Sequence, residues 1–229
     1  MIYKKRNIAI LIFALSQEEE MKRKPFLANN SIQTDLTSQT IAVAKKTGLD
    51  YFLYNENQQF GTSFGERFSN AIEDIYKKGY DAVITLGNDT PNLGKAHLLK
   101  AVETLESGQS AIGPSFDGGF YLLGIHKESF DKTEFTKLSW NTSEVRKDLY
   151  SYLDSKNKSF YQLDFLYDLD HFSDVLNIYK TLPFLLKELR RILQSLLQKE
   201  EKVIRTTQLL VSSIILGAHF NKGSPYLST

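Results

Sequence analysis

Cysteine is absent from the 229 residues of the chain. Disulfides and thiolate chemistry are therefore excluded, and the composition fits a reducing compartment. An excess of charge is also missing, because 28 Lys and Arg residues balance 27 Asp and Glu residues. A general affinity for nucleic acid or for a charged membrane surface is therefore not expected. No apolar run approaches the ~20 residues that cross a bilayer, so we expect no membrane span and a cytoplasmic location.

Several functional motifs are missing too. The four histidines lie far apart, without metal-binding spacing, and neither a GxSxG motif nor a P-loop is present. No organic prosthetic group is expected. The N-terminus, MIYKKRNIAILIFAL, has basic residues before an apolar run, as a signal peptide does. Because that run is short and acidic residues follow it, a first buried strand is the better interpretation.

Apolar runs alternate with helical periodicity along most of the chain. Strands are predicted at 8–14, 51–54, 82–86, 110–113 and 120–125, and helices at 31–46, 63–78 and 95–105. This alternation is typical of βαβ units and predicts an α/β fold with three layers, in which helices cover both faces of a mostly parallel sheet. Ligands bind such sheets beyond the carboxyl ends of the strands.

The pattern changes after Trp140. We expect a helix at 143–153, an extended segment at 160–163, a helix at 172–179 and a long amphipathic helix at 184–204. The apolar stripe of the last helix is typical of core packing or of a homodimer seam. The predicted organisation is a nucleotide-binding domain at 1–183, followed by a C-terminal helical extension and tail at 184–229.

The stretch LGNDTPNL at 86–93 follows a predicted strand. A carboxylate at a strand end can hold a hard cation such as Mg²⁺, which keeps several waters and needs few protein ligands. Asp89 fits that role. The alternative is that Asn88 and Asp89 cap the next helix, with Pro91 in its first turn.

Two further acidic stretches allow a similar choice. In GPSFDGGFYLLG, at 113–124, two glycines after Asp117 allow a close approach to a ligand or form a hairpin turn. In YDLDHFSDV, at 167–175, Asp168 and Asp170 alternate on one face of an extended segment. They share a metal, or Asp170 caps the following helix.

Four blocks occur in an order and spacing that resemble one family: QQFGTSFGERF, LGNDTPNL, GPSFDGGFYLLG and LSWNTS. Over about residues 7–180 the chain resembles the DUF2064 proteins, glycosyltransferases of GT-A fold. These are similar to nucleotide-diphospho-sugar transferases and to small nucleotidyltransferases such as the molybdenum cofactor and 2-phospholactate guanylyltransferases.

The resemblance implies a site for a nucleotide or nucleotide sugar at the strand ends. Asp89 is then expected to be catalytic and to ligate Mg²⁺ or Mn²⁺, with Asp168 or Asp170 completing the metal site. Asp117 is expected beside the transferred group. Further nucleotide contacts are expected from the remaining polar and glycine positions of these blocks, which are Arg67, Asn88, Gly118 and Gly119. Arg67 is equally well interpreted as an exposed or capping arginine.

The first loop departs from the relatives. Many nucleotidyltransferases have a glycine-rich phosphate cradle there, whereas ALSQEEEMKRKPF at 14–26 contains no glycine. Lys22, Arg23 and Lys24 remain as candidates for neutralising a diphosphate, and the alternative is a solvated charged loop. Three hypotheses follow: a metal-dependent glycosyltransferase with a nucleotide-diphospho-sugar donor, a nucleotidyltransferase, and a non-catalytic nucleotide-binding protein.

Overall fold

The computed structural model describes residues 6–24 and 32–170 and the single positions 174, 178, 194 and 198. The chain divides into two units, Met1–Leu185 and Leu186–Thr229, and the fold below is that of the first. The predicted domain boundary stays a prediction. The helix expected at 184–204 and the homodimer seam on it lie outside the described residues, apart from two helical positions, Gln194 and Gln198.

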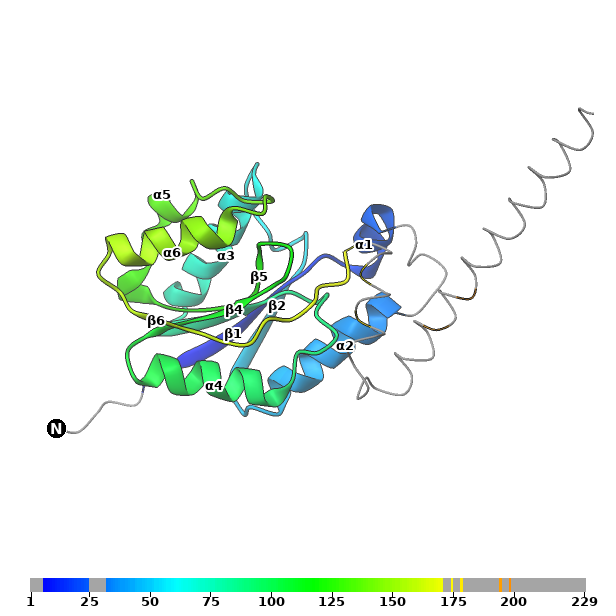
Figure 1. The fold of residues 1–229 in the computed structure, drawn as a ribbon, viewed down its shortest axis with the longest axis horizontal. Helices are drawn as coiled ribbons and strands as arrows, with labels where there is room; N and C mark the ends of the chain where they lie inside the picture. The colour runs from blue at the N-terminus through cyan, green and yellow to red at the C-terminus, as the bar shows by residue number, and fades with distance from the viewer. Residues whose placement is uncertain are drawn as a thin grey trace, which may run out of the picture. The chain divides into compact units, whose positions relative to one another are not determined.

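One mixed sheet forms the centre of the described fold (Figure 1). Its strand order is β2-β1-β3-β5-β4-β6, and β5 is antiparallel to both of its neighbours, whereas the other pairs are parallel. The predicted α/β class is confirmed, with a sheet that is mixed around β5. The strands are β1 (Ile8–Phe13), β2 (Asp50–Tyr54), β3 (Ala82–Leu86), β4 (Ser110–Pro114), β5 (Phe120–His126) and β6 (Phe160–Gln162).

Helices cover both faces of this sheet, so the fold has three layers (Figure 1). Alternate residues of β1 serve the two faces: Ile10 packs beneath α2 and α4, whereas Leu11 packs beneath α3, α5 and α6. This double burial explains why β1 is apolar without interruption. The helices are α1 (Gln17–Arg23), α2 (Ile32–Lys45), α3 (Phe64–Lys77), α4 (Lys95–Glu106), α5 (Lys132–Phe135) and α6 (Val145–Ser155), with a 3₁₀ turn, η2, at Lys127–Ser129. No helix among the described residues is long and apolar enough to be a membrane span.

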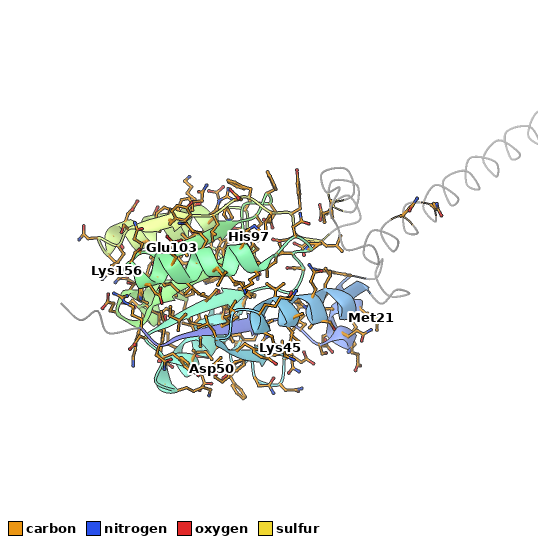
Figure 2. All side chains as sticks on the ribbon, turned by 90° about the horizontal axis from the view of Figure 1, so that it is seen from below. Met21, Lys45, Asp50, His97, Glu103 and Lys156 are labelled. Carbon is orange, nitrogen blue, oxygen red and sulfur yellow. The ribbon has the colours of Figure 1, made fainter. Side chains whose placement is uncertain are left out.

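Helix α1 was not expected from the sequence, which predicts a polar charged segment there. Ser16 caps this helix by accepting a hydrogen bond from the Glu19 N–H. Acidic side chains occupy its first turn and basic ones its last turn, which suits the helix dipole. Figure 2 shows α1, which carries Met21, beside α2. A charged sequence therefore forms an ordered wall next to the carboxyl end of β1.

Three loops meet at the carboxyl edge of the sheet. Strands β2 and β3 lie on opposite sides of β1, which makes the end of β1 a topological switch point where α/β folds bind ligands. The segment after β6 continues along β4 and reaches the loop after β3. The Leu166 N–H donates to the Pro114 carbonyl oxygen (3.1 Å), and the Leu169 N–H donates to the Asp89 carbonyl oxygen (2.8 Å). This path brings acidic residues that lie about eighty positions apart to one edge.

Candidate active site

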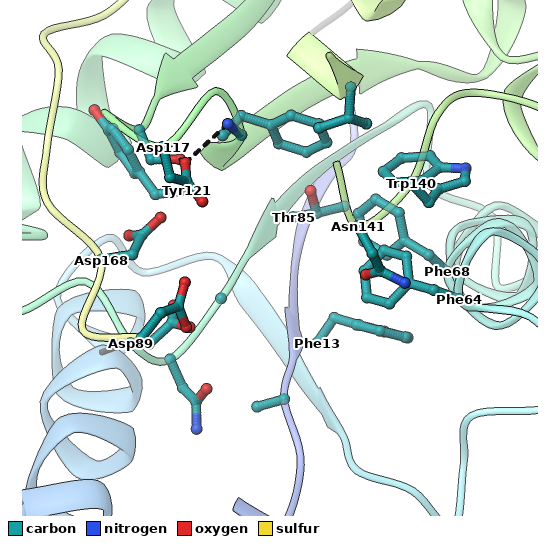
Figure 3. Close-up of a pocket in the computed structure, with 18 of the residues that line it drawn as sticks. Phe13, Phe64, Phe68, Thr85, Asp89, Asp117, Tyr121, Trp140, Asn141 and Asp168 are labelled. Atoms are coloured by element: carbon teal, nitrogen blue, oxygen red, sulfur yellow. Dashed lines mark hydrogen bonds between the residues drawn. The ribbon is translucent and has the colours of Figure 1, made fainter. Parts of the chain in front are cut away.

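A cavity of about 480 Å³ lies beyond the carboxyl ends of β1 and β3. This volume is within the range of small-molecule sites. Carboxylates line one side and aromatic rings the other, as Figure 3 shows for Asp89, Asp117 and Asp168 opposite Phe13, Phe64 and Trp140. Of the predicted site residues, the cavity lining includes Arg67, Asn88, Asp89, Asp117, Gly119, Asp168 and Asp170.

Asp89 and Asp170 meet at the ammonium group of Lys24. The Lys24 Nζ lies 3.2 Å from Asp89 Oδ2 and 2.8 Å from Asp170 Oδ1. It also donates to the Leu169 carbonyl oxygen at 3.0 Å. Only 11% of the Lys24 side chain is exposed. Burial lowers the pKa of Lys24, but three surrounding carboxylates more than offset it, so the net pKa is raised and the group stays charged.

Glu20 is the third carboxylate beside this ammonium. Its Oε2 is buried, lies 3.8 Å from Lys24 Nζ and has no hydrogen-bond partner among the described residues. Burial raises the pKa of Glu20, and the nearby Lys24 partly opposes that effect. Glu20 lines the cavity. Glu20 carries no sequence signal of this position, because three consecutive glutamates are typical of a solvated surface.

Asp168 has a different environment from Asp170. Its Oδ1 accepts a 2.5 Å hydrogen bond from Thr90 Oγ1. Burial raises the pKa of Asp168 well above its usual range, and the neighbouring Asp89 carboxylate adds to the effect. The two aspartates lie near each other, as predicted, but one engages a hydroxyl group and the other engages Lys24.

Asn88 and Asp89 do not cap the next helix, because α4 begins at Lys95 with Gly94 as its N-cap. The capping interpretation is therefore wrong. Instead, Asn88 is buried and donates to Thr37 Oγ1 at 2.9 Å. This bond anchors the loop after β3 to α2 and directs the next residue, Asp89, to the cavity.

Asp117 lies in the turn of the hairpin between β4 and β5. Its Oδ1 accepts bonds from Ser115 Oγ (2.7 Å) and from the Gly119 N–H (2.8 Å), which leaves Oδ2 without a hydrogen-bond donor from the described residues. The hairpin interpretation is confirmed, and the ligand-binding interpretation stays a prediction. Gly118 has a φ of +98°, and an added Cβ would lie 2.2 Å from the Ser143 carbonyl oxygen. Gly118 thus holds two loops together and is not among the cavity-lining residues.

Two arginines line the cavity without internal partners. Arg67, on the second turn of α3, and Arg23, at the end of α1, make no side-chain hydrogen bond or ion pair with other described residues. By contrast, Lys22 pairs with Glu19 at 2.6 Å, is 60% exposed and does not line the cavity. Within the described part of the chain, the two guanidinium groups are therefore the cations that line the cavity without a hydrogen bond or ion pair. Of the three basic residues expected to neutralise a diphosphate, Lys22, Arg23 and Lys24, Arg23 alone lines the cavity.

Aromatic side chains form the opposite wall. Trp140 packs between Phe64 and Phe68, with centroid distances of 5.4 Å to each, and its Nε1 donates to the Phe135 carbonyl oxygen. This packing requires glycine at position 65, since an added Cβ there would lie 2.5 Å from Trp140 Cδ1. Trp140 therefore both packs against the core and lines the cavity.

Asn141 follows this tryptophan and lines the cavity with a φ of 61°. Left-handed backbone is uncommon outside glycine, though Asn tolerates it best, and such residues cluster at functional sites. Figure 3 shows the side chain between the aromatic wall and Thr85. The WNTS block carried a signal for this loop, but backbone conformation alone identifies Asn141.

The predicted Mg²⁺ or Mn²⁺ has Asp89, Asp168 and Asp170 as its expected ligands. Within the described ranges, no group of three or more His, Asp or Glu side chains is arranged to hold a metal ion. The Lys24 ammonium instead occupies the point where two of the expected ligands converge. As placed, these carboxylates do not fit a resident divalent ion, and the ligand assignment stays a prediction.

The family comparison agrees with the four blocks. The model of the family described as "Uncharacterized protein conserved in bacteria (DUF2064)" matches residues 33–142. The resemblance to DUF2064 is confirmed. The matched DUF2064 segment contains Arg67, Asp89 and Asp117, whereas α1 and the Asp168 segment lie outside it. None of the curated proteins matches the chain.

Solved structures share the fold. A protein from Desulfovibrio desulfuricans G20, proposed to be a nucleotide-diphospho-sugar transferase, is 23% identical, with a TM-score of 0.71 over 88% of this chain and 98% of that chain. This likeness shows that the chain has a fold similar to that of nucleotide-diphospho-sugar transferases.

Weaker likenesses include two other proteins. The Rv0371C complex with manganese from Mycobacterium tuberculosis H37Rv is 11% identical, with a TM-score of 0.43 over 76% of this chain and 99% of that chain. A 4-diphosphocytidyl-2C-methyl-D-erythritol synthase from Anaerococcus prevotii DSM 20548 is 11% identical, with a TM-score of 0.43 over 85% of this chain and 97% of that chain. Scores at this level carry no argument about activity.

Proposed function

We propose that the cavity binds a nucleotide-diphospho-sugar and that the protein is a glycosyltransferase. The observation that carries this proposal is the pair of guanidinium groups, Arg23 and Arg67, which line the cavity and make no side-chain hydrogen bond or ion pair with the other residues that the structure describes. Arginine forks bind phosphate oxygens through two parallel charged hydrogen bonds. A diphosphate is the anion that suits two such groups in one cavity.

The donor chemistry follows from this placement. Cleavage of the bond between the sugar carbon and the diphosphate leaves negative charge on the leaving nucleoside diphosphate. Two guanidinium groups that line the cavity would stabilise that charge as it develops. The aromatic wall formed by Phe13, Phe64 and Trp140 offers a flat apolar surface on which a nucleobase can stack.

We assign Asp117 to the side of the cavity that binds the acceptor of the sugar. Its Oδ2 has no donor among the described residues, while two hydrogen bonds hold Oδ1 in place. Such a carboxylate can take the proton of an acceptor hydroxyl as that oxygen bonds to the sugar carbon. Gly119, which has no side chain, leaves room beside Asp117 for the acceptor.

Calorimetry against UDP, GDP, ADP, CDP and their sugar conjugates tests the proposal, with Arg67→Met as the variant. We expect one nucleoside diphosphate and its sugar to bind wild type and to lose affinity in the variant. If none of the panel binds, the proposal is wrong. Release of pyrophosphate from a nucleoside triphosphate with a sugar phosphate would instead identify a nucleotidyltransferase, and binding without hydrolysis or transfer would identify a binding protein.

A further inference from the structure

The charge balance of the acidic side of the cavity needs a cation. Glu20, Asp89 and Asp170 contribute three carboxylates to one region, and their side chains are 10%, 26% and 40% exposed, respectively. Carboxylates gathered in a partly buried region repel one another unless a positive charge lies between them. In this fold that charge belongs to the chain itself.

Lys24 is held in place by both its backbone and its side chain. It ends α1, where its N–H donates to the Glu20 carbonyl oxygen at 2.8 Å. Its ammonium then donates to oxygens of Asp89, Asp170 and Leu169. An ammonium group has three protons to donate, and these three acceptors use all of them.

We propose that the Lys24 ammonium is the resident cation of this site and takes the place that a divalent ion occupies in a metal-dependent transferase. The two carboxylates that would ligate the ion instead contact Lys24 Nζ through Asp89 Oδ2 and Asp170 Oδ1. Glu20 Oε2, which has no hydrogen-bond partner, adds a third negative charge that suits an ammonium 3.8 Å away. The phosphates of a ligand are then left to Arg23 and Arg67. This inference concerns the unliganded site and does not depend on the donor being a nucleotide sugar.

Removal of the ammonium should create a divalent site. Lys24→Met keeps the length of the side chain and removes its charge, which leaves three carboxylates without a counter-ion. We expect wild type to bind Mn²⁺ with a dissociation constant above about 1 mM, and Lys24→Met to bind at least about tenfold more tightly. Electron paramagnetic resonance of Mn²⁺ measures the free ion directly in both proteins.

Lys22→Met is the matched control. It removes the same charge from the same helix and also frees two carboxylates, those of Glu18 and Glu19. Those groups are exposed, so we expect Lys22→Met to bind Mn²⁺ as weakly as wild type. Asp89→Asn in the Lys24→Met background should abolish the new binding.

Three outcomes would overturn the inference. The first is Mn²⁺ binding by wild type below about 0.1 mM that Asp89→Asn removes, because the site then accepts the ion with Lys24 present. The second is a folded Lys24→Met protein that binds no better than wild type. The third is a wild-type affinity for nucleoside diphosphate that Mn²⁺ raises more than about tenfold and that depends on Asp89.

If Lys24→Met does not fold, the Mn²⁺ titration of the wild-type protein decides. Failure of every nucleotide to bind would count against the proposed function and leave the ion titration as the test of Lys24.

Discussion

The backbone N–H of Leu169 donates a 2.8 Å hydrogen bond to the carbonyl oxygen of Asp89. This bond joins the segment after β6 to the loop after β3, and the residues beside it carry Asp168 and Asp170 into the cavity. The acidic side of the site therefore depends on a long-range backbone contact.

The first prediction concerns Arg67. Arg67→Met should weaken binding of the preferred nucleoside diphosphate by about tenfold, because charge-assisted hydrogen bonds to phosphate are lost. The free energy of unfolding should change by less than about 0.5 kcal/mol, since the guanidinium loses no internal partner. Calorimetry and urea denaturation measure the two effects. Lys100→Met, which removes an exposed charge on α4, is the control and should leave affinity unchanged. Equal affinity of Arg67→Met and wild type would remove Arg67 from the site.

The second prediction concerns Gly118. Gly118→Ala should lower the free energy of unfolding by at least about 3 kcal/mol, because left-handed backbone is strained and the Cβ would overlap the Ser143 carbonyl oxygen. Gly48→Ala is the matched control: its φ is +78°, but its Cβ would meet nothing within 4 Å. It should cost only about 1 kcal/mol. If urea denaturation gave the same loss of unfolding free energy for Gly118→Ala and Gly48→Ala, the contact between Gly118 and Ser143 would contribute nothing.

The third prediction concerns Gln59, whose side-chain amide donates to the carbonyl oxygens of Ala14 and Tyr54, each at 2.9 Å. Gln59→Ala should lower the free energy of unfolding by about 2 kcal/mol, because the Ala14 carbonyl oxygen after β1 loses this buried donor, whereas the Tyr54 carbonyl oxygen keeps the Ala14 N–H. The neighbouring Gln58→Ala is the control, since Gln58 is exposed and should cost less than about 0.5 kcal/mol. Chemical denaturation of both variants checks the difference.

The fourth prediction concerns His97 and pH. Burial lowers the pKa of His97, and its Nδ1 accepts a 3.0 Å bond from the Gly94 N–H at the start of α4. At a pH just below the ordinary pKa of histidine, His97 is therefore protonated more in the unfolded chain than in the folded protein. The free energy of unfolding then falls as the pH drops through that range. His97→Gln keeps an acceptor at this position without titrating. Its unfolding free energy should fall less than that of wild type between about pH 7.5 and about pH 5. Parallel slopes would contradict this account.

Sequence patterns predict the fold well where burial alone decides it. The uninterrupted apolar run of β1, the helical spacing of Phe68, Ile72 and Ile75 in α3, and the stop at Gly79 all hold in the structure. The direction of β5 does not follow from composition, because a short apolar strand suits parallel and antiparallel neighbours alike. Helix α1 was missed because its stability comes from a serine cap and from charges along the helix axis rather than from an apolar stripe.

The site was predictable in its acidic members and less so in its cations. Asp89, Asp117 and Asp168 follow strands or turns, where sequence position indicates the cavity edge. Arg23 and Lys24 are adjacent and both carry a positive charge. Lys24 is buried among carboxylates, whereas Arg23 lines the cavity and makes no hydrogen bond or ion pair with the other described residues. Their difference arises from the direction in which α1 ends, and this direction depends on tertiary contacts.

The reversal of β5 has a consequence for how such a site can diversify. Because β5 runs against β4, a turn of five residues, 115–119, forms one rim of the cavity, while helical crossovers carry the opposite rim. A short turn can change in length and sequence without rerouting any helix. We therefore expect acceptor preference to drift readily among related proteins through this turn, while the donor-binding side stays under the constraint of the whole scaffold.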